Sequence, residues 1–167
     1  LQVGIVLFSA GAAFVAETRL VTQARVSFTQ SLPMRLLPQI ESVPGVDKVM
    51  WQQWFGGVWQ ENTQLIVFAT DALRLHALYP EYVMPDAQWK ADPETRTGMI
   101  VGRNLANQYG WKIGQKVPIA SNIFPQKDGS KAWAFDVVGI FDGKDEEWQR
   151  ATNLAYINFD YFDEANQ

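Results

Sequence analysis

The chain has 167 residues, a formal net charge of −4 and a hydrophobic share of 47%. This length and composition predict one folded domain, or two lobes around a core, and exclude a disordered chain. The acidic balance argues against a nucleic-acid-binding surface, which needs clustered Lys and Arg. The absence of cysteine excludes disulfides, zinc-thiolate sites and thiol nucleophiles.

The first 16 residues, LQVGIVLFSAGAAFVA, are uncharged and rich in Gly and Ala. Three interpretations are open for this segment: the outer end of a transmembrane helix, a buried helix, or the apolar part of a secretory signal. It is shorter than the roughly 20 residues of a full span, and it lacks the basic start of a signal sequence. We expect residues 1–16 to be the end of a transmembrane helix or an N-terminal helix, and residues 17–167 to form a separate domain.

The first half of the chain alternates predicted strands with short helices. In order, these are a strand over residues 19–28, a helix over 31–42, a strand over 46–54, a second run over 58–60, a buried strand over 65–69 and a helix over 71–79. Gly56-Gly57 is predicted to turn the strand over 46–54 into the run that follows, as in a hairpin. The polar, Pro-containing stretch 84–96 is expected to be a surface excursion with one helical turn.

The segment Thr97 to Gly143 is predicted to organise the fold. Its strand Met99–Val101 leads through Gly102 into a helix that Gly110 ends. Further strands are predicted from Lys116 and over 133–141, followed by a charged loop over 144–150, a strand over 153–157 and a helix capped by Asn158 or Asp160. This order indicates an α+β fold, with a mixed and largely antiparallel sheet and short packed helices.

The sequence predicts no catalytic, cofactor-binding or metal-binding residue. The one histidine, His76, has no second ligand nearby and is expected to be structural or exposed. No elbow serine motif and no Gly-rich phosphate-binding motif occurs. The acidic run Asp145 to Glu147 is expected to be a solvated loop, and Asp92 and Glu94 are expected to lie in a surface turn.

Four aromatic residues surround Gly56-Gly57 and are the candidate partner contact: Trp51, Trp54, Phe55 and Trp59. One interpretation is that they form hydrophobic core on the predicted hairpin. The alternative is that the hairpin presents them to a partner, because exposed Trp and Phe are enriched at interface hot spots.

The chain also carries an ordered set of motifs: SFTQSLPMRLLPQIESVPGVDKV, WFGG, LYPEY, GMIVGRNLANQYGWKIGQKVPI, WAFDVVGIFDG and FDYFDEA. Over roughly residues 19–165 this order resembles the extracytoplasmic domain of the FtsX-like permease family, close to the MacB type and its periplasmic core architecture. Family domains continue past this point into a further section before a second membrane helix, so the resemblance leaves open whether the domain is complete at its C-terminus.

The resemblance implies a non-enzymatic, mechanotransmission role at the outer face of a bacterial inner membrane. Such a permease works with a separate cytoplasmic ATPase, and its extracytoplasmic domain passes movement to an exported substrate or a partner protein. The implied partners are therefore that ATPase, the membrane through flanking helices and a second permease copy, with no nucleic acid and no cofactor. Two alternatives stay open: a small-ligand receptor whose pocket the aromatic cluster lines, and a secreted hydrolase whose carboxylates meet in space.

Overall fold

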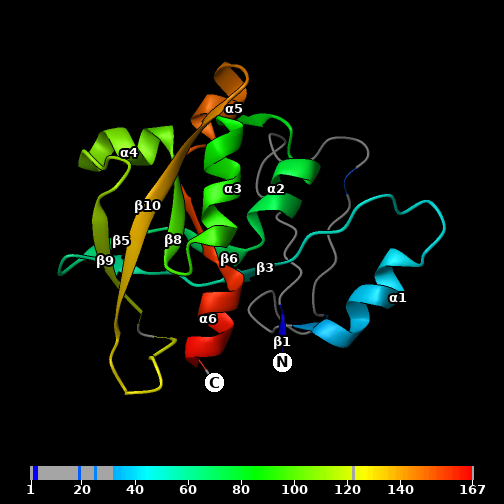
Figure 1. Cartoon of the computed structure of the whole chain (residues 1–167), viewed down its shortest axis with the longest axis horizontal. Coiled ribbons are helices and arrows are strands. Elements are labelled where there is room, and N and C mark those ends of the chain that lie inside the picture. The colour runs from blue at the N-terminus through cyan, green and yellow to red at the C-terminus, as the bar shows by residue number, and fades with distance from the viewer. Residues whose placement is uncertain (1, 4–18, 20–24, 26–31, 122, 167) are drawn as a thin grey trace.

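The computed structural model describes residues 2–3, 19, 25, 32–121 and 123–166. Within this part, one sheet of nine strands runs in the order β3-β6-β11-β8-β10-β9-β4-β5, with β7 paired to the end of β10 (Figure 1). Strands β8 and β10 are parallel, as are β6 and β11, and the remaining pairs are antiparallel. The predicted α+β class and mixed sheet are confirmed.

The strand and helix bounds follow chain order. The strands are β1 (Gln2–Val3), β2 (Leu32–Pro33), β3 (Gln52–Trp54), β4 (Val58–Trp59), β5 (Thr63–Gln64), β6 (Val67–Thr70), β7 (Tyr82–Val83), β8 (Gly98–Gly102), β9 (Lys116–Ala120), β10 (Ala132–Gly143) and β11 (Ala155–Asn158). The helices are a 3₁₀ turn at Met34–Leu36, α1 (Leu37–Glu41), α2 (Ala72–Leu78), α3 (Asp86–Glu94), α4 (Arg103–Tyr109), α5 (Glu146–Arg150) and α6 (Phe159–Asn166).

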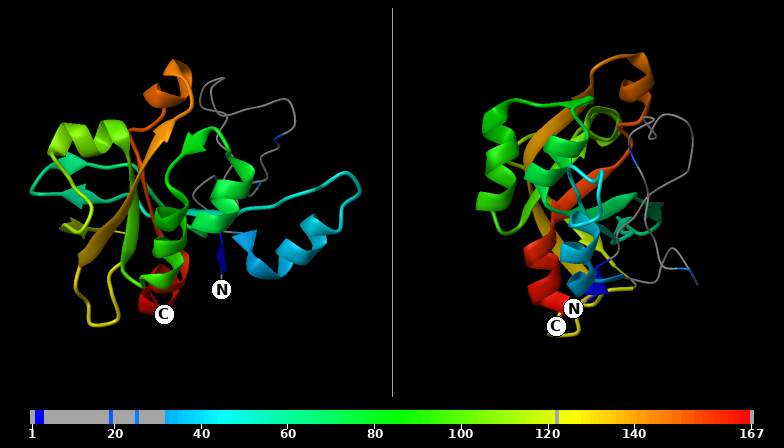
Figure 2. Two further views of the ribbon diagram at one scale, coloured as in Figure 1. Left: turned by 45° about the horizontal axis from the view of Figure 1, so that its top comes forward. Right: turned by 90° about the vertical axis from the view of Figure 1, so that its right-hand side faces the viewer.

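Both faces of the sheet are buried, and side chains alternate between two hydrophobic clusters. Met99 and Val101 of β8 belong to one cluster with residues of α4 and α6, whereas Ile100 between them belongs to the other with residues of α2 and α3. β6 and β11 alternate in the same way. Successive side chains of a strand point to opposite faces, so these strands present apolar side chains on both faces. Helices cover both faces of the sheet (Figures 1 and 2).

The prediction of a hairpin turn at Gly56-Gly57 is wrong. β3 pairs with β6 and β4 pairs with β5 in one continuous register, from Gln52 opposite Thr70 to Trp59 opposite Thr63, so the chain reverses near Gln60. The two glycines, with φ values of 71° and 122°, bend this long hairpin in its middle. Its base therefore joins β11 through β6, while its tip joins β9, which curls the sheet.

The predicted helical turn in the stretch 84–96 is a longer, buried helix, and the predicted loop over 144–150 contains a helix. The stretch 84–96 contains α3, in which Trp89 is fully buried against the sheet, because one aromatic and one carboxyl side chain make the inner face of an otherwise polar helix. The charged loop over 144–150 contains α5, whose Trp148 is buried and whose N-terminus is capped by Asp145. In both segments the burial of a single Trp outweighs the polar composition.

The local signals at helix ends were predictive. Asp71 accepts hydrogen bonds from the Leu73 and Arg74 amides at the start of α2, and Asn158 does the same at the start of α6. Gly110 ends α4 in the left-handed conformation. The predicted helix over 31–42 begins later, because Leu32–Pro33 is the strand β2, and it ends at Ser42 as α1, which lies apart from the sheet (Figure 2).

The apolar segment 1–16 lies outside the described residues except for Gln2 and Val3, which form β1 and pair with β2. The predicted strand over 19–28 also lies outside them, apart from Arg19 and Arg25. Among the helices that the structure does describe, none combines the length and the apolar character that a bilayer crossing requires.

Gly102 and Gly110 provide a matched pair for testing close backbone approach. A Cβ on Gly102 would lie 2.0 Å from the Thr152 carbonyl oxygen, whereas a Cβ on Gly110 would have no heavy atom within 4 Å. We expect Gly102→Ala to cost roughly 3 kcal/mol or more of unfolding free energy, and Gly110→Ala about 1 kcal/mol because only the positive φ is strained. Urea denaturation of both variants measures this, and equal losses would contradict the packing at Gly102.

Candidate functional site

The four aromatic residues of the candidate partner contact do not form one patch. Phe55 is fully buried, and its ring meets Trp133, Phe135 and Phe162 edge-on at 5.5, 5.8 and 6.1 Å between ring centroids. The sequence interpretation of core therefore holds for Phe55.

The other three aromatic residues are half-buried and lie at different places along the bent hairpin. Trp51 packs against Phe159, Trp54 against Phe68, and Trp59 against Tyr109 and Trp111. A contact between these three tryptophans and a partner stays a prediction.

A Phe55→Ala variant tests the core assignment. We expect a loss of about 3 to 5 kcal/mol in the free energy of unfolding, because a buried aromatic ring with edge-to-face neighbours is removed. Leu73→Ala, at a position 48% exposed, is the control and should cost far less. If chemical denaturation gave the two variants the same stability, Phe55 would not be a core residue.

A small cavity opens where the parallel strands β6 and β11 end. Its volume is about 50 Å³, and it is lined by Trp51, Thr70, Asp71, Ala72, Asp92, Pro93, Asn158, Phe159 and Asp160. This volume admits water but no substrate, since ligand pockets generally reach several hundred Å³. A larger groove of about 320 Å³ lies beside α1 and α2, but none of the four candidate aromatic residues lines it. The interpretation as a small-ligand receptor required the aromatic cluster to line a pocket of ligand size, and this groove does not meet that requirement.

Asp92 is the chemically unusual residue of the small cavity, and the prediction that it lies in a surface turn is wrong. The residue is 3% exposed, and its Oδ1 has no hydrogen-bond partner among the described residues. Burial, followed by the nearby Asp71 carboxylate, raises the pKa of Asp92 to about 7. The group can therefore exist as a neutral carboxylic acid at physiological pH. Sequence gave no sign of this, because Asp92 lies in a polar stretch.

The raised pKa makes stability depend on pH. The folded state holds the Asp92 proton up to about pH 7, while the unfolded state releases it near pH 4, so the unfolding free energy should fall as pH rises between these values. Relative to Asp92→Asn, the wild-type chain should lose about 3 kcal/mol between pH 5 and pH 8. Glu94→Gln, at an exposed position of the same helix, is the control. Parallel wild-type and Asp92→Asn curves would show that Asp92 ionises normally.

The remaining predicted polar residues do not converge on a reactive centre. His76 is exposed and stacks on Trp89 at 4.5 Å between ring centroids. Asp145 caps α5, and Glu146 and Glu147 lie in its first turn. In the described ranges, no three His, Cys, Asp or Glu side chains converge in a way that could hold a metal ion.

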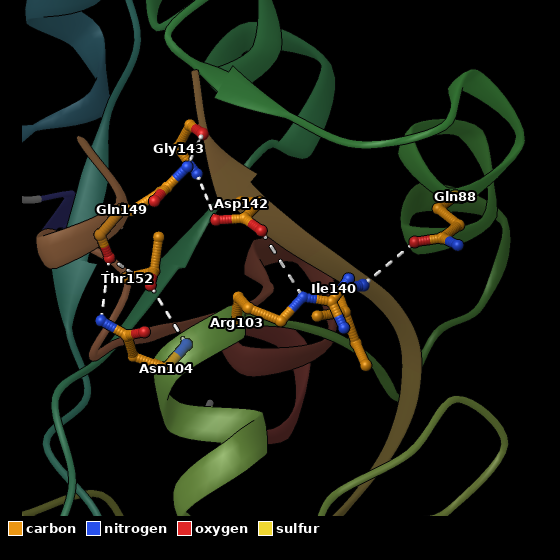
Figure 3. Close-up of polar contacts among 8 residues, drawn as sticks. All are labelled: Gln88, Arg103, Asn104, Ile140, Asp142, Gly143, Gln149 and Thr152. Carbon is orange, nitrogen blue, oxygen red and sulfur yellow. Dashed lines mark hydrogen bonds and ion pairs between the residues drawn. The ribbon is translucent and has the colours of Figure 1, made fainter. Parts of the chain in front are cut away.

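A joint between β8, α4, β10 and α5 brings together the motif residues of the organising segment (Figure 3). Thr152 is fully buried, and its Oγ1 accepts from the Asn104 amide at 3.1 Å and donates to the Gln149 carbonyl at 2.7 Å. Asn104 Nδ2 also donates to that carbonyl, at 2.9 Å. Thr152 thus supplies the cap that Gly102, the residue before α4, cannot provide.

The end of β10 is fixed to the same joint. A Cβ on Gly143 would lie 2.1 Å from the Trp148 carbonyl carbon and the Gln149 nitrogen, so β10 lies directly against the α5 backbone. Asp142 accepts from the Gly143 amide at 2.8 Å and faces Arg103 at 3.7 Å, a partly exposed ion pair that adds little stability. The joint is a close-packed connection between these four elements, and its polar contacts hold backbone groups and helix ends in position.

Comparisons with known proteins find a distant structural likeness. No protein-family model matches the sequence, and no curated protein matches it. One solved structure that resembles this one in part is described as "a domain of a putative Permease protein from Porphyromonas gingivalis". It is 11% identical over 74% of this chain and 56% of that chain, with a TM-score of 0.48. This chain thus spans little more than half of that domain, and the likeness is too distant to extend its description to this protein.

Proposed function

We propose that this chain is the non-catalytic extracytoplasmic domain of an FtsX-like ABC transporter permease of the MacB type. The observation that carries the proposal is the ordered motif set, above all GMIVGRNLANQYG and WAFDVVGIFDG, whose order resembles that of the family. In this role the domain hydrolyses nothing. It receives movement from a separate cytoplasmic ATPase and passes it to a substrate or partner outside the membrane.

The positions of the motif residues support the resemblance on physical grounds. Gly102 and Gly143 are required by backbone approach, and Leu105, Ala106 and Phe141 are buried. The motif residues are thus positions that this fold needs, which is consistent with a resemblance in fold. A domain held rigid by such joints is suited to transmitting movement between two states.

The proposal is tested by locating the protein in cells and by assaying the chain for ATP hydrolysis. An epitope-tagged protein expressed from its own gene should sediment with membranes, and added protease should reach this domain only from the outer face of the inner membrane. The purified chain should show no ATP turnover above buffer. Recovery of the tagged protein in the cytosolic fraction, or measurable turnover, would refute the proposal.

A further inference from the structure

Arg19 occupies a binding site made by residues far away in the sequence. Its guanidinium carbon lies 4.5 Å from the centre of the Tyr79 ring and 5.7 Å from that of Trp148. Its Nε donates to the Leu78 carbonyl oxygen at 3.0 Å, and its Nη2 pairs with Glu81 Oε1. Two aromatic rings, a carbonyl and a carboxylate are together the groups that recognise a guanidinium.

This ion pair is the most buried one among the described residues. The Arg19 and Glu81 side chains are each 12% exposed, whereas every side chain in the other described pairs is at least 32% exposed. Yet Arg19 Nη1 and Glu81 Oε2 are buried without a hydrogen-bond partner among these residues. A buried pair with unsatisfied atoms offsets little of its desolvation cost, so it is better suited to a contact that forms and breaks than to permanent core.

The residues around Arg19 are connected to the joint at the end of β10. The Lys144 amide donates to the Glu81 carbonyl at 2.9 Å, and the neighbouring Tyr82 hydroxyl donates to the Ala151 carbonyl at 3.0 Å. Trp148, which covers Arg19, is the residue whose backbone lies against Gly143. Arg19 is therefore connected through Glu81 and Trp148 to α5 and to the end of β10.

We propose that Tyr79, Glu81 and Trp148 form a docking site for the N-terminal segment of this chain, in which Arg19 is the anchor. The contacts stand by themselves, but the role of this docking in passing on movement rests on the proposed permease function. Arg19 follows the apolar segment 1–16 closely, so in a permease the anchor would stand where the first membrane helix meets the domain. Movement of that helix would then reach the β10 joint through one side chain.

Trypsin digestion of the full chain under native conditions tests the docking site. Trypsin cleaves after an arginine only when it can bind the guanidinium, and docking withholds that of Arg19, while Arg25 is exposed and serves as an internal reference. In the wild-type chain, cleavage after Arg19 should be slower than cleavage after Arg25. In Glu81→Gln the ratio of the two rates should rise about tenfold, because the paired charge is removed.

Glu41→Gln is the matched control. Arg74 pairs with Glu41 at 3.0 Å and lies 4.5 Å from the Trp51 ring centre, so it repeats the chemistry of the Arg19 site at an exposed position. This variant should leave the cleavage ratio unchanged. Equal rates after Arg19 and Arg25 in the wild-type chain, or an unchanged ratio in Glu81→Gln, would overturn the docking site.

A second measurement needs no variant and therefore still tests the site if Glu81→Gln fails to fold. In the wild-type chain, the Arg19 Nε–H should exchange with solvent at least tenfold more slowly in NMR spectra than that of Arg25, because it donates to a carbonyl. Equal exchange would overturn the site without any variant. The outcome is separable from that of the permease proposal: a membrane-bound protein with an unprotected Arg19 refutes the docking site alone, and a cytosolic protein with a protected Arg19 refutes the permease role alone.

Discussion

Direct contact between backbones at two glycines holds the ends of the central strands in place. Gly102 at the end of β8 lies against the Thr152 carbonyl, and Gly143 at the end of β10 lies against the α5 backbone. Any side chain there would separate the strands from α5 and from the turn that follows it. Thr152 could then no longer cap α4, and Trp148 could no longer cover the site that holds Arg19. The α4 cap and the cover over Arg19 thus both depend on the close packing at the joint.

The joint consists of rigidly packed elements, which is the property that the proposed role in passing on movement requires. Interfaces and packed cores change between discrete arrangements instead of deforming continuously, so a small displacement at one contact is passed on through rigid neighbours. The elements around the joint have buried aromatic side chains, and the one buried ion pair in the described residues lies beside it. The polar side chains there hold backbone groups in position. Gln88 and Asp142, for example, accept hydrogen bonds from backbone amides of β10.

Sequence reasoning failed where a single buried side chain decided the structure. The stretches containing α3 and α5 are polar in composition, and each is held to the sheet by one tryptophan, Trp89 or Trp148. Periodicity needs several apolar positions to indicate a helix, so only one helical turn was predicted where α3 runs from Asp86 to Glu94, and α5 was not predicted. The burial of Asp92 was missed because the stretch was expected to lie at the surface, whereas α3 packs against the sheet. Arg19 and Glu81 carry no local pattern at all.

The sequence by itself determined the central strands, the helix ends and the fold class. The strand at Met99–Val101, the caps at Asp71 and Asn158 and the stop at Gly110 depend only on neighbouring residues, and all are present. Tertiary structure alone decided the bend of the long hairpin and the face of each residue in β10. A bulge after Val137 moves the following residues to the opposite face, so Val137 and Phe141 lie in different clusters. Such choices depend on partners that are distant in the chain, which no local window contains.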